Sequence, residues 1–340
     1  MSSTRPIEII GGGLAGLSLG LALQNVGIAV RVIEAGNYPR HRVCGDFMTG
    51  LSAVTVESLG LKPLLADALQ HRQVAWFYRE QLICEQRLPA PALGLSRYAL
   101  DARLAQAFTA AGGELHRATR ANDSGPLPGR ILAHGRSRSE SPWLGLKLHV
   151  HDLRLAHDLE LHLGHEAYIG LAKVETGAVN VCGLFRRRNL AAPGPALLAA
   201  YLKAVGLPRL ADRIARATFE NGSFSAVSAL SYEPVIAAPD TISLGDAGGL
   251  IPPFTGNGMA IAFQSAETAL PHVVAYARGK VSWTATCNQT HSALRRRFHH
   301  RLTFARSLQP FLLAPSRQRF VSALARAHLL PLRLLYTLLH

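Results

Sequence analysis

The chain has 340 residues, of which 48% are hydrophobic and only 17% are charged, so it is not an intrinsically disordered protein. Its length allows a large core, or two lobes that share one. Thirty-six lysines and arginines against 22 acidic residues give a net charge of +14, which favours acidic partners such as nucleic acid, anionic lipid or a phosphorylated cofactor. No zinc-finger spacing and no RNA-binding aromatic strand occurs, so we expect no nucleic-acid partner.

The first 34 residues have the pattern of a β-α-β unit. Apolar runs over residues 6–10 and 28–33 predict two short buried strands. Residues 17–26 between them predict a helix of small and apolar residues. The second strand ends at Glu34, a position from which a carboxylate accepts hydrogen bonds from a ribose in dinucleotide-binding units.

A G-x-G-x-x-G spacing joins the first predicted strand to the helix, in the residues Gly11, Gly13 and Gly16. In this motif the first glycine permits the tight turn, the second lets a pyrophosphate approach the backbone, and the third lets helix and strand pack closely. The helix N-terminus then presents N–H groups and the positive end of its dipole to the phosphates. We expect the dinucleotide to contact Gly11, Gly13, Leu14, Ala15 and Gly16.

The rest of the chain alternates between strands, helices and loops. We expect a loop over residues 35–50, a helix over 51–69, strands over 74–86, a helix over 97–108 capped by Ser96, and a strand at 131–133 within the loops of 121–141. Further on we expect strands over 143–185, helices over 196–206 and 208–217, a strand over 241–244, a long helix from about Gly258, and helices over 288–340.

A second motif follows the short strand at residues 241–244. Gly245-Asp246-Ala247 places an acid at a strand end beside glycine, where a carboxylate can hold a ribose or ribityl hydroxyl. Gly256 and Gly258 then expose backbone N–H groups at the start of a helix, which suits an anion or an electron-rich ring edge.

Together these motifs resemble the p-hydroxybenzoate hydroxylase-like FAD superfamily, over roughly residues 5–275. The resemblance rests on the two glycine motifs and on Arg97-x-x-Leu-Asp101-x-x-Leu between them. It implies an extended FAD, with Glu34 on the adenosine ribose and Asp246 on the ribityl chain. It also implies Arg97 near the pyrophosphate or ribityl, Gly245 beside Asp246, and the turn Gly256, Asn257 and Gly258 against the isoalloxazine. Arg42 could bind the pyrophosphate, or simply face solvent.

Within that superfamily the details look like the geranylgeranyl reductase-like branch. Arg42-Val-Cys44-Gly45-Asp46 resembles the Cys-Gly element of those reductases, and Gly245-Asp246 lacks the histidine that aromatic hydroxylases often place after Gly-Asp-Ala. Cys44 has two readings. Flanked by basic residues, its thiol would have a lowered pKa and take part in redox chemistry or positioning near the flavin. Otherwise it is a small side chain that packs the loop.

The chain departs from many relatives at Ala133-His134-Gly135, where they carry an Asp-Gly pair tied to FAD and NAD(P)H handling. This departure argues against direct, hydroxylase-style use of NADPH. The electron donor therefore stays open between NAD(P)H and a ferredoxin-like protein attracted by the positive surface.

The predicted fold is α/β, with a Rossmann-like FAD-binding lobe that is split in sequence, an inserted β-sheet substrate lobe and a helical C-terminal cap. We assign residues 1–72, 95–140 and 235–275 to the FAD-binding lobe, 73–94 and 141–234 to the substrate lobe, and 276–340 to the C-terminal helices.

The expected function is an FAD-dependent oxidoreductase that transfers hydride through the flavin to or from a small hydrophobic metabolite, such as an isoprenoid, polyketide or lipid-like compound. The alternative enzyme is an O2-dependent flavin monooxygenase. The alternative from another class is a membrane-surface binding protein in which the nucleotide fold is only a scaffold. Leucines interleaved with arginines over residues 311–340 suit either a helical cap on the substrate lobe or an interfacial helix on anionic lipid.

Compartment and metal content complete the predictions. Four widely spaced cysteines without a C-x-x-C pair indicate free thiols in a reducing compartment. Residues 9–31 are apolar enough for a membrane span, but their glycine spacing favours the nucleotide turn, so we expect a cytoplasmic protein with the peripheral contact as an alternative. His149 and His151 share one strand face without a third ligand nearby in sequence, so we expect no metal.

Overall fold

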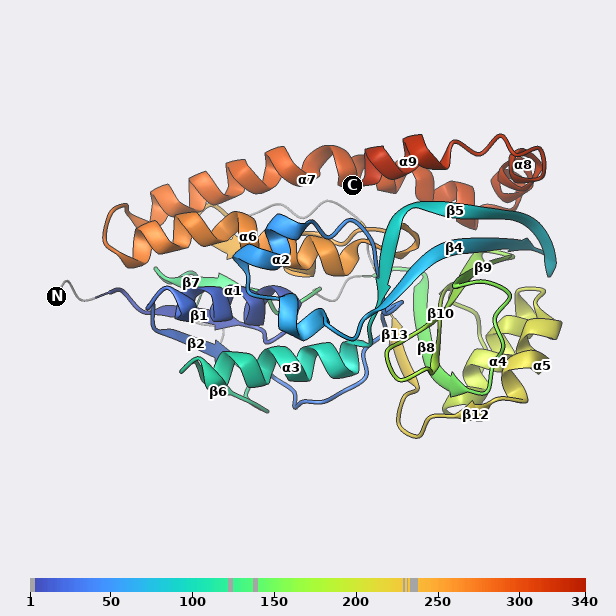
Figure 1. The fold of residues 1–340 in the computed structure, drawn as a ribbon, viewed down its shortest axis with the longest axis horizontal. Helices are drawn as coiled ribbons and strands as arrows, with labels where there is room; N and C mark the ends of the chain where they lie inside the picture. The colour runs from blue at the N-terminus through green and yellow to red at the C-terminus, as the bar shows by residue number, and fades with distance from the viewer. Residues whose placement is uncertain (1–3, 122–124, 137–139, 229, 231, 233–237) are drawn as a thin grey trace.

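The chain forms a parallel sheet and a larger mixed sheet side by side, with a long helical layer across both (Figure 1). The computed structural model describes residues 4–121, 125–136, 140–228, 230, 232 and 238–340. The elements of the first half are β1 (Ile7–Ile10), α1 (Leu14–Asn25), β2 (Val30–Ile33), β3 (Phe47–Met48), α2 (Ala53–Ser58), η1 (Lys62–Leu65), β4 (Leu69–Tyr78), β5 (Gln81–Gly94), α3 (Arg97–Ala110), β6 (Glu114–His116), β7 (Arg130–Leu132), β8 (Trp143–His151) and β9 (Leu159–Gly164).

The second half adds the remaining strands and most of the helices. Its elements are β10 (Ala167–Lys173), β11 (Val179–Arg186), α4 (Pro195–Ala204), α5 (Pro208–Ala215), β12 (Thr218–Phe219), β13 (Ser225–Ser228), β14 (Ile242–Ser243), η2 (Gly245–Gly248), η3 (Pro253–Thr255), α6 (Gly258–Ala277), α7 (Trp283–Leu313), α8 (Pro315–Arg326) and α9 (Leu332–Leu339).

The smaller sheet is parallel and has the order β14-β7-β1-β2-β6. Its strands are short and apolar because both faces are covered: α1, α3 and α6 contribute Leu17, Phe108 and Phe263 to one continuous buried core with Ile9 and Val32. The strand order is that of a Rossmann-like nucleotide-binding sheet, which reverses direction beside β1.

The larger sheet has nine strands in the order β12-β8-β11-β10-β9-β4-β5-β3, with β13 also paired to β8. One face of β8, β10 and β11 packs against α4 and α5 around Leu148, Ile169 and Phe185. The long hairpin β4–β5 arches from this sheet back to the smaller one, where Phe47 of β3 pairs with Gly94 (Figure 1).

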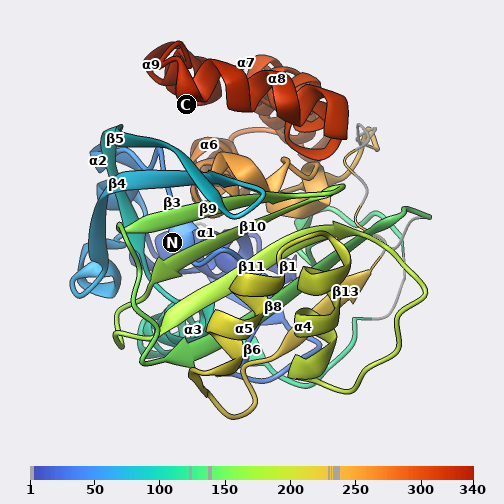
Figure 2. The same ribbon diagram turned by 90° about the vertical axis from the view of Figure 1, so that its right-hand side faces the viewer.

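The C-terminal helices form a layer over one edge of the molecule, with α7 along α6 and with α8 and α9 beyond β5 (Figure 2). None of the described helices is long and apolar enough to cross a bilayer. The apolar segment from residue 9 divides into β1, the glycine turn and α1, a helix of only 12 residues.

The predicted α/β fold with a helical C-terminal region is confirmed, and the differences from the predicted elements are local. The helix expected over residues 51–69 is split into α2 and η1, because Gly60 adopts a left-handed φ of +66° just past α2 and Pro63 follows. The predicted boundary between residues 234 and 235 lies outside the described residues.

Candidate functional site

The two sequence motifs meet at one edge of the parallel sheet. Gly11 directly follows β1, Ala133 directly follows β7, and Gly245 lies just beyond β14. Because all three strands are parallel, these residues lie at the same carboxyl edge, where the strand order reverses. Sheets of this kind bind ligands in the crevice at such a switch point.

The three glycines of the N-terminal motif have different surroundings. A Cβ on Gly11 would lie 2.3 Å from the carbonyl oxygen of Ala133, and one on Gly16 would lie 2.0 Å from that of Gly11. Gly11 also has a φ of +111°, which L side chains rarely adopt. By contrast, a Cβ on Gly13 would meet no described atom within 4 Å. Gly11 and Gly16 therefore serve close packing, while Gly13 faces open space of the kind that a pyrophosphate needs.

The N-terminus of α1 is open to an anion. Gly13 is its N-cap, no side chain caps the helix, and its first turn contains no acidic residue. Helix N-termini leave backbone N–H groups without intrahelical partners, and these groups attract negative charge. Leu14 and Ala15 are buried in this first turn, so they can offer a ligand only their backbone.

Glu34 holds the backbone of the glycine turn. Its buried carboxylate accepts the N–H of Gly12 at 2.8 Å and that of Gly36 at 2.8 Å, and it pairs with Arg40 at 2.7 Å. Tyr38 covers the same turn, since its hydroxyl donates to the Gly12 carbonyl oxygen. Tyr38 could not be predicted, because one tyrosine in a polar loop has no characteristic spacing to the glycine motif.

Arg42 and Arg97 converge on Asp101, which is fully buried. Arg97 donates from Nε at 2.7 Å and Arg42 from Nε at 2.8 Å. Burial alone would lower the pKa of Arg97, but the Asp101 carboxylate raises it above its ordinary value. The buried Nη2 of Arg42 and Nε of Arg40 have no hydrogen-bond partner among the described residues. An anion beside this loop would supply the missing acceptor, which fits a dinucleotide pyrophosphate.

Of the two interpretations of Cys44, the structure favours the packing side chain over the activated thiol. Burial, followed by the Asp46 carboxylate, raises the pKa of Cys44 to about 11. The flanking arginines turn to Glu34 and Asp101 instead of the sulfur, so they do not hold the pKa of the thiol down. The Cys44 carbonyl oxygen accepts the side-chain N–H of Asn180 at 2.9 Å, which ties this loop to the larger sheet.

A buried charge network that the sequence analysis missed lies next to Cys44. Asp46 accepts from the ammonium of Lys147 at 3.0 Å and from Nε2 of His149 at 2.9 Å, and all three side chains are almost fully buried. Its other oxygen accepts the Arg97 N–H at 3.1 Å. Burial alone would raise the pKa of Asp46, but Lys147 and then His149 lower it. The network joins the nucleotide-site loop to β8.

The second motif packs against the first. Gly245 has a φ of +57°, and a Cβ there would lie 3.3 Å from that of Ala15 and 3.6 Å from that of Ala262, so η2 fits between α1 and α6. Burial raises the pKa of Asp246, with Arg97 the strongest opposing influence. The predicted cofactor residues Gly13 and Asp246 thus belong to one region.

The turn before α6 is built by the β3 loop. Gly256 adopts a left-handed φ of +68°, and its carbonyl oxygen accepts the Thr49 N–H at 2.9 Å. A Cβ at Gly256 would lie 3.0 Å from the Phe47 ring. No side chain caps α6, and its first turn, from Gly258, has no acidic residue. This second open helix N-terminus fits an electron-rich ring edge.

The Asn257 side chain is already bound by protein groups. Its Nδ2 donates to the Leu339 carbonyl oxygen at 2.7 Å, and its Oδ1 accepts from Thr255 at 2.5 Å. His340 lies beside it, with Nε2 at 2.6 Å from Thr49 Oγ1. Asn257 can therefore offer a cofactor only its backbone, and the end of α9 buttresses the turn.

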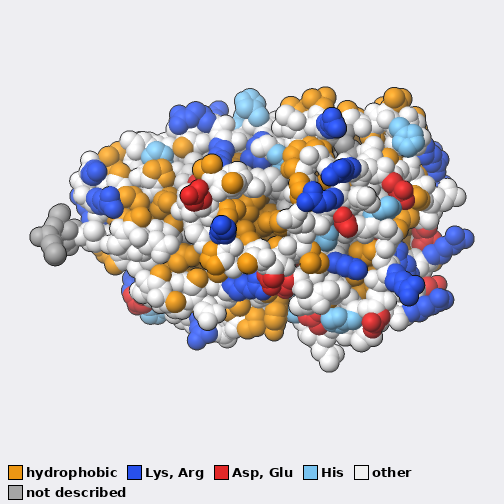
Figure 3. Space-filling model, in the orientation of Figure 1, with side chains coloured by type: hydrophobic (Ala, Val, Ile, Leu, Met, Phe, Trp, Pro, Cys, Tyr) orange, Lys and Arg blue, Asp and Glu red, His pale blue; other side chains and the backbone are white. Residues whose placement is uncertain are grey.

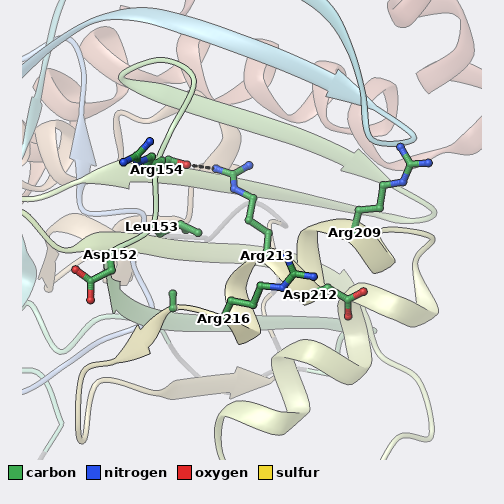
Figure 4. Close-up of a pocket in the computed structure, with 8 residues that line it drawn as sticks. Asp152, Leu153, Arg154, Arg209, Asp212, Arg213 and Arg216 are labelled. Carbon is green, nitrogen blue, oxygen red and sulfur yellow. Dashed lines mark hydrogen bonds between the residues drawn. The ribbon is translucent and has the colours of Figure 1, made fainter.

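Of two cavities among the described residues, one lies away from this crevice and the other reaches Gly245 of the second motif. One, of about 510 Å³, lies beside the larger sheet, between α5 and the loop after β8. Figure 4 shows Arg154, Arg209, Arg213 and Arg216 around it, with Arg213 directed toward Arg154. There Arg213 is held by Glu160 at 2.8 Å and by the Arg154 carbonyl oxygen at 2.8 Å. The other, of about 420 Å³, lies between η2 and α7 and is lined partly by His291, Arg295 and Phe298. Neither cavity contains the Gly13 cradle.

Sequence similarity to known proteins is limited to a short segment of the chain. No protein-family model matches the chain. A menaquinone reductase of Mycobacterium tuberculosis is 33% identical over 66 residues, which are 19% of this chain and 16% of that protein. The sequence match thus spans about one sixth of the relative's length.

Solved structures match over nearly the whole chain. A Klebsiella pneumoniae protein, HpxO, complexed with FAD and uric acid, has a TM-score of 0.76 at 14% identity and covers 100% of this chain and 97% of its own. PqsL of Pseudomonas aeruginosa, a probable FAD-dependent monooxygenase, has a TM-score of 0.70 at 15% identity, with coverages of 93% and 99%.

A geranylgeranyl bacteriochlorophyll reductase-like protein of Thermoplasma acidophilum has a TM-score of 0.73 at 16% identity, with coverages of 94% and 91%. The chain therefore has the fold of these flavoproteins and their relatives. Both enzyme classes weighed from the sequence, the monooxygenase and the reductase, occur on this fold. The chemistry of this chain has to be argued from its own residues.

Proposed function

We propose that the protein is an FAD-dependent oxidoreductase that acts on a small hydrophobic metabolite by hydride transfer. The open cradle at Gly13, beside the uncapped N-terminus of α1, is the observation that carries this proposal. Nε of Arg40 and Nη2 of Arg42 make no hydrogen bond among the described residues, and Nη2 of Arg42 lies only at 3.8 Å from Glu34. A pyrophosphate in this loop region would supply hydrogen-bond acceptors to both. The FAD-bound structural neighbour supports the choice of dinucleotide.

The residues of the crevice would divide the work of holding the cofactor. The first turn of α1 would bind the pyrophosphate, and Glu34, which already fixes the glycine turn, would face the adenosine ribose. Asp246 would hold a ribityl hydroxyl, and the Gly256–Gly258 turn would lie along the isoalloxazine. When bound, FAD accepts and donates hydride or reacts with oxygen, while the protein sets orientation and excludes water.

The substrate is proposed to be hydrophobic because an apolar cluster lies between the larger sheet and the loop before α6. It contains buried Leu161, Tyr168 and Leu250, with Phe254 packed against it. The indole N–H of Trp76 is buried there without a hydrogen-bond partner among the described residues. Ligand sites of this type combine apolar walls with a few polar groups that fix orientation.

Figure 3 shows hydrophobic and basic side chains interleaved along the edge that carries the C-terminal helices. Phe320, Leu329 and Leu334 are exposed there, at 57%, 66% and 58%. Such a surface fits peripheral contact with anionic lipid, from which a lipid-like substrate would be drawn. We keep both NAD(P)H and a ferredoxin-like protein as electron donors.

A spectrum of the purified protein tests the cofactor. We expect a yellow protein with flavin absorbance, and a Glu34→Ala variant that loses the colour. A protein that stays colourless after addition of FAD would favour the alternative of a membrane-surface binding protein on a nucleotide-binding scaffold.

Oxygen consumption separates the two enzyme classes. With FAD, NADPH and a candidate isoprenoid, a reductase oxidises NADPH even under argon. In air, addition of the isoprenoid does not increase its oxygen consumption. Substrate-dependent oxygen uptake would instead establish the O2-dependent monooxygenase, the class to which the p-nitrophenol 4-monooxygenase of Pseudomonas putida belongs on the same fold.

A further inference from the structure

A cluster of imidazoles surrounds Glu220 at the junction of the two lobes. Nε2 of His41 lies 3.4 Å from Glu220 Oε1. Nδ1 of His149 lies 3.5 Å and Nε2 of His151 lies 3.4 Å from Glu220 Oε2. The ligand atoms of His41, His149 and Glu220 all lie within 4.8 Å of one another.

The fold explains how residues so far apart in sequence meet. His149 and His151 alternate onto one face of β8, while the neighbouring Leu148 and Val150 face the α4–α5 core. β12 pairs with the end of β8, and the Glu220 N–H donates to the His149 carbonyl oxygen at 3.0 Å. His41 reaches the same point from the nucleotide-site loop.

We propose that His41, His149 and Glu220 form a binding site for a divalent transition metal, with zinc the best match, that clamps the nucleotide-site loop to the larger sheet. Zinc takes imidazole nitrogen and carboxylate oxygen at about 2.0–2.2 Å in tetrahedral geometry. Two tetrahedral ligands at such bond lengths lie about 3.3–3.6 Å from each other. His41 lies at 3.4 Å from one oxygen of Glu220 and His149 at 3.5 Å from the other, separations that are long for direct hydrogen bonds. Because the ligand atoms span up to 4.8 Å, a metal would draw them together by about 1 Å or less.

The surroundings prepare two of the ligands. The second nitrogen of His149 faces Asp46 at 2.9 Å, so donation of its proton there leaves Nδ1 as the metal-binding atom. Such carboxylate–histidine–metal triads orient metal ligands. The ring of His41 faces Glu220 through Nε2 and Lys147 through Nδ1, so its orientation is fixed from two sides. His151, on the open side of the cluster, is the natural fourth ligand, with water as the alternative.

Lys147 sets the condition for loading. Its ammonium lies 3.3 Å from Nδ1 of His41 and 3.0 Å from Asp46. When a metal occupies Nε2 of His41, Nδ1 carries the proton, so Lys147 must turn fully to Asp46. The affinity of the site therefore depends on this ion pair as well as on the ligands.

Metal titration of the purified full-length protein tests the site. After EDTA treatment and desalting, Zn²⁺ is titrated by calorimetry, and Tm is measured with and without one equivalent of Zn²⁺. We expect one equivalent to bind and to raise Tm. His41→Asn and Glu220→Gln should each lower affinity at least tenfold and remove the Tm shift, while His151→Asn should have a smaller effect.

His165→Asn is the matched control, because His165 is an exposed histidine on the same lobe, 3.8 Å from Glu166. This variant should bind zinc like the unmodified protein. Absence of stoichiometric binding at 100-fold excess zinc would overturn the proposal and leave a hydrogen-bonded cluster only. Binding that survives His41→Asn and Glu220→Gln would also overturn it. Since neither readout involves flavin or turnover, the result is independent of the proposed function.

Discussion

The proposed cofactor crevice and the junction between the two sheets are built in opposite ways. In the crevice the proposed binding groups are backbone N–H groups at two helix N-termini, which the lack of side chains at Gly11, Gly13 and Gly16 leaves accessible or closely packed. At the junction the working groups are side chains, with the buried Asp46–Lys147 pair at its centre. The first design depends on open space, and the second depends on complete pairing of charge in a dry interior.

Removal of one buried partner should give the largest effect. Asp46→Ala leaves the Lys147 ammonium buried without a carboxylate, which should cost about 3–5 kcal/mol of unfolding free energy. Chemical denaturation measures this loss. The double variant Asp46→Asn with Lys147→Met removes both charges. Asparagine also tolerates the φ of 49° at position 46, so this variant should recover most of the stability. Equal losses in the single and double variants would show that the pair is not the cause.

Alanine in place of two neighbouring glycines should separate folding from binding. Gly11→Ala forces a Cβ against the Ala133 backbone at positive φ and should cost roughly 1–3 kcal/mol of stability. Gly13→Ala meets no protein atom, so stability should change by less than about 0.5 kcal/mol. It should nevertheless weaken FAD binding at least tenfold, about 1.4 kcal/mol, as measured by quenching of flavin fluorescence. Normal FAD affinity in Gly13→Ala would place the pyrophosphate elsewhere.

Acidification should destabilise the protein well before the carboxylates titrate. Burial lowers the pKa of His41 and of His340 to about 4, while the unfolded chain takes up these protons near pH 6.5. Stability is therefore complete above pH 6.5 and falls as the pH drops towards 4, by at most about 2 kcal/mol for each histidine at pH 5. Tm measured from pH 8 to pH 5 gives this slope, which His41→Gln and His340→Gln should flatten. A Tm that rises on acidification would contradict both assignments.

Changes on the C-terminal helices should have the smallest effect on folding. Because Leu329 and Leu334 are exposed, a double serine variant should alter stability by less than about 0.5 kcal/mol. Its partition onto anionic vesicles should fall at least about tenfold, since each buried leucine contributes roughly 1.5–3 kcal/mol. Co-sedimentation with phosphatidylserine vesicles measures this change, with neutral vesicles as the control. Equal vesicle binding by the variant and the unmodified protein would favour the alternative that these helices cap the larger sheet.

The contrast between the two regions also explains what could be predicted. The residues around the crevice could be predicted because the first strand, the glycine spacing and Glu34 lie close together in the sequence. The reversal of strand order beside β1 then places Gly245 at the same edge of the sheet. The contacts at the junction could not be predicted, because Asp46, Lys147 and Glu220 are far apart in the sequence and form no recognisable motif. A local clue existed on β8, where Lys147 and His149 interrupt leucines, but only the pairing with β12 shows what they face.

The same reasoning explains which of the two interpretations of Cys44 the structure favours. Its basic neighbours in sequence suggested a thiolate, but the loop turns their charges to Glu34 and Asp101 and leaves the sulfur desolvated. Proximity along the chain predicts electrostatic influence only where the backbone also directs the charges to the same point.

The pairing of β3 with the end of β5 has a mechanical consequence. A strand of 14 residues runs from the larger sheet to Gly94, where it meets Phe47, and α3 begins only three residues later. The Asp46–Lys147 pair is a second tie between the nucleotide-site loop and the larger sheet, so the described residues join the two sheets at more than one point. We expect a single cooperative unfolding transition in calorimetry, and access for a substrate by loop movement rather than by a clamshell opening.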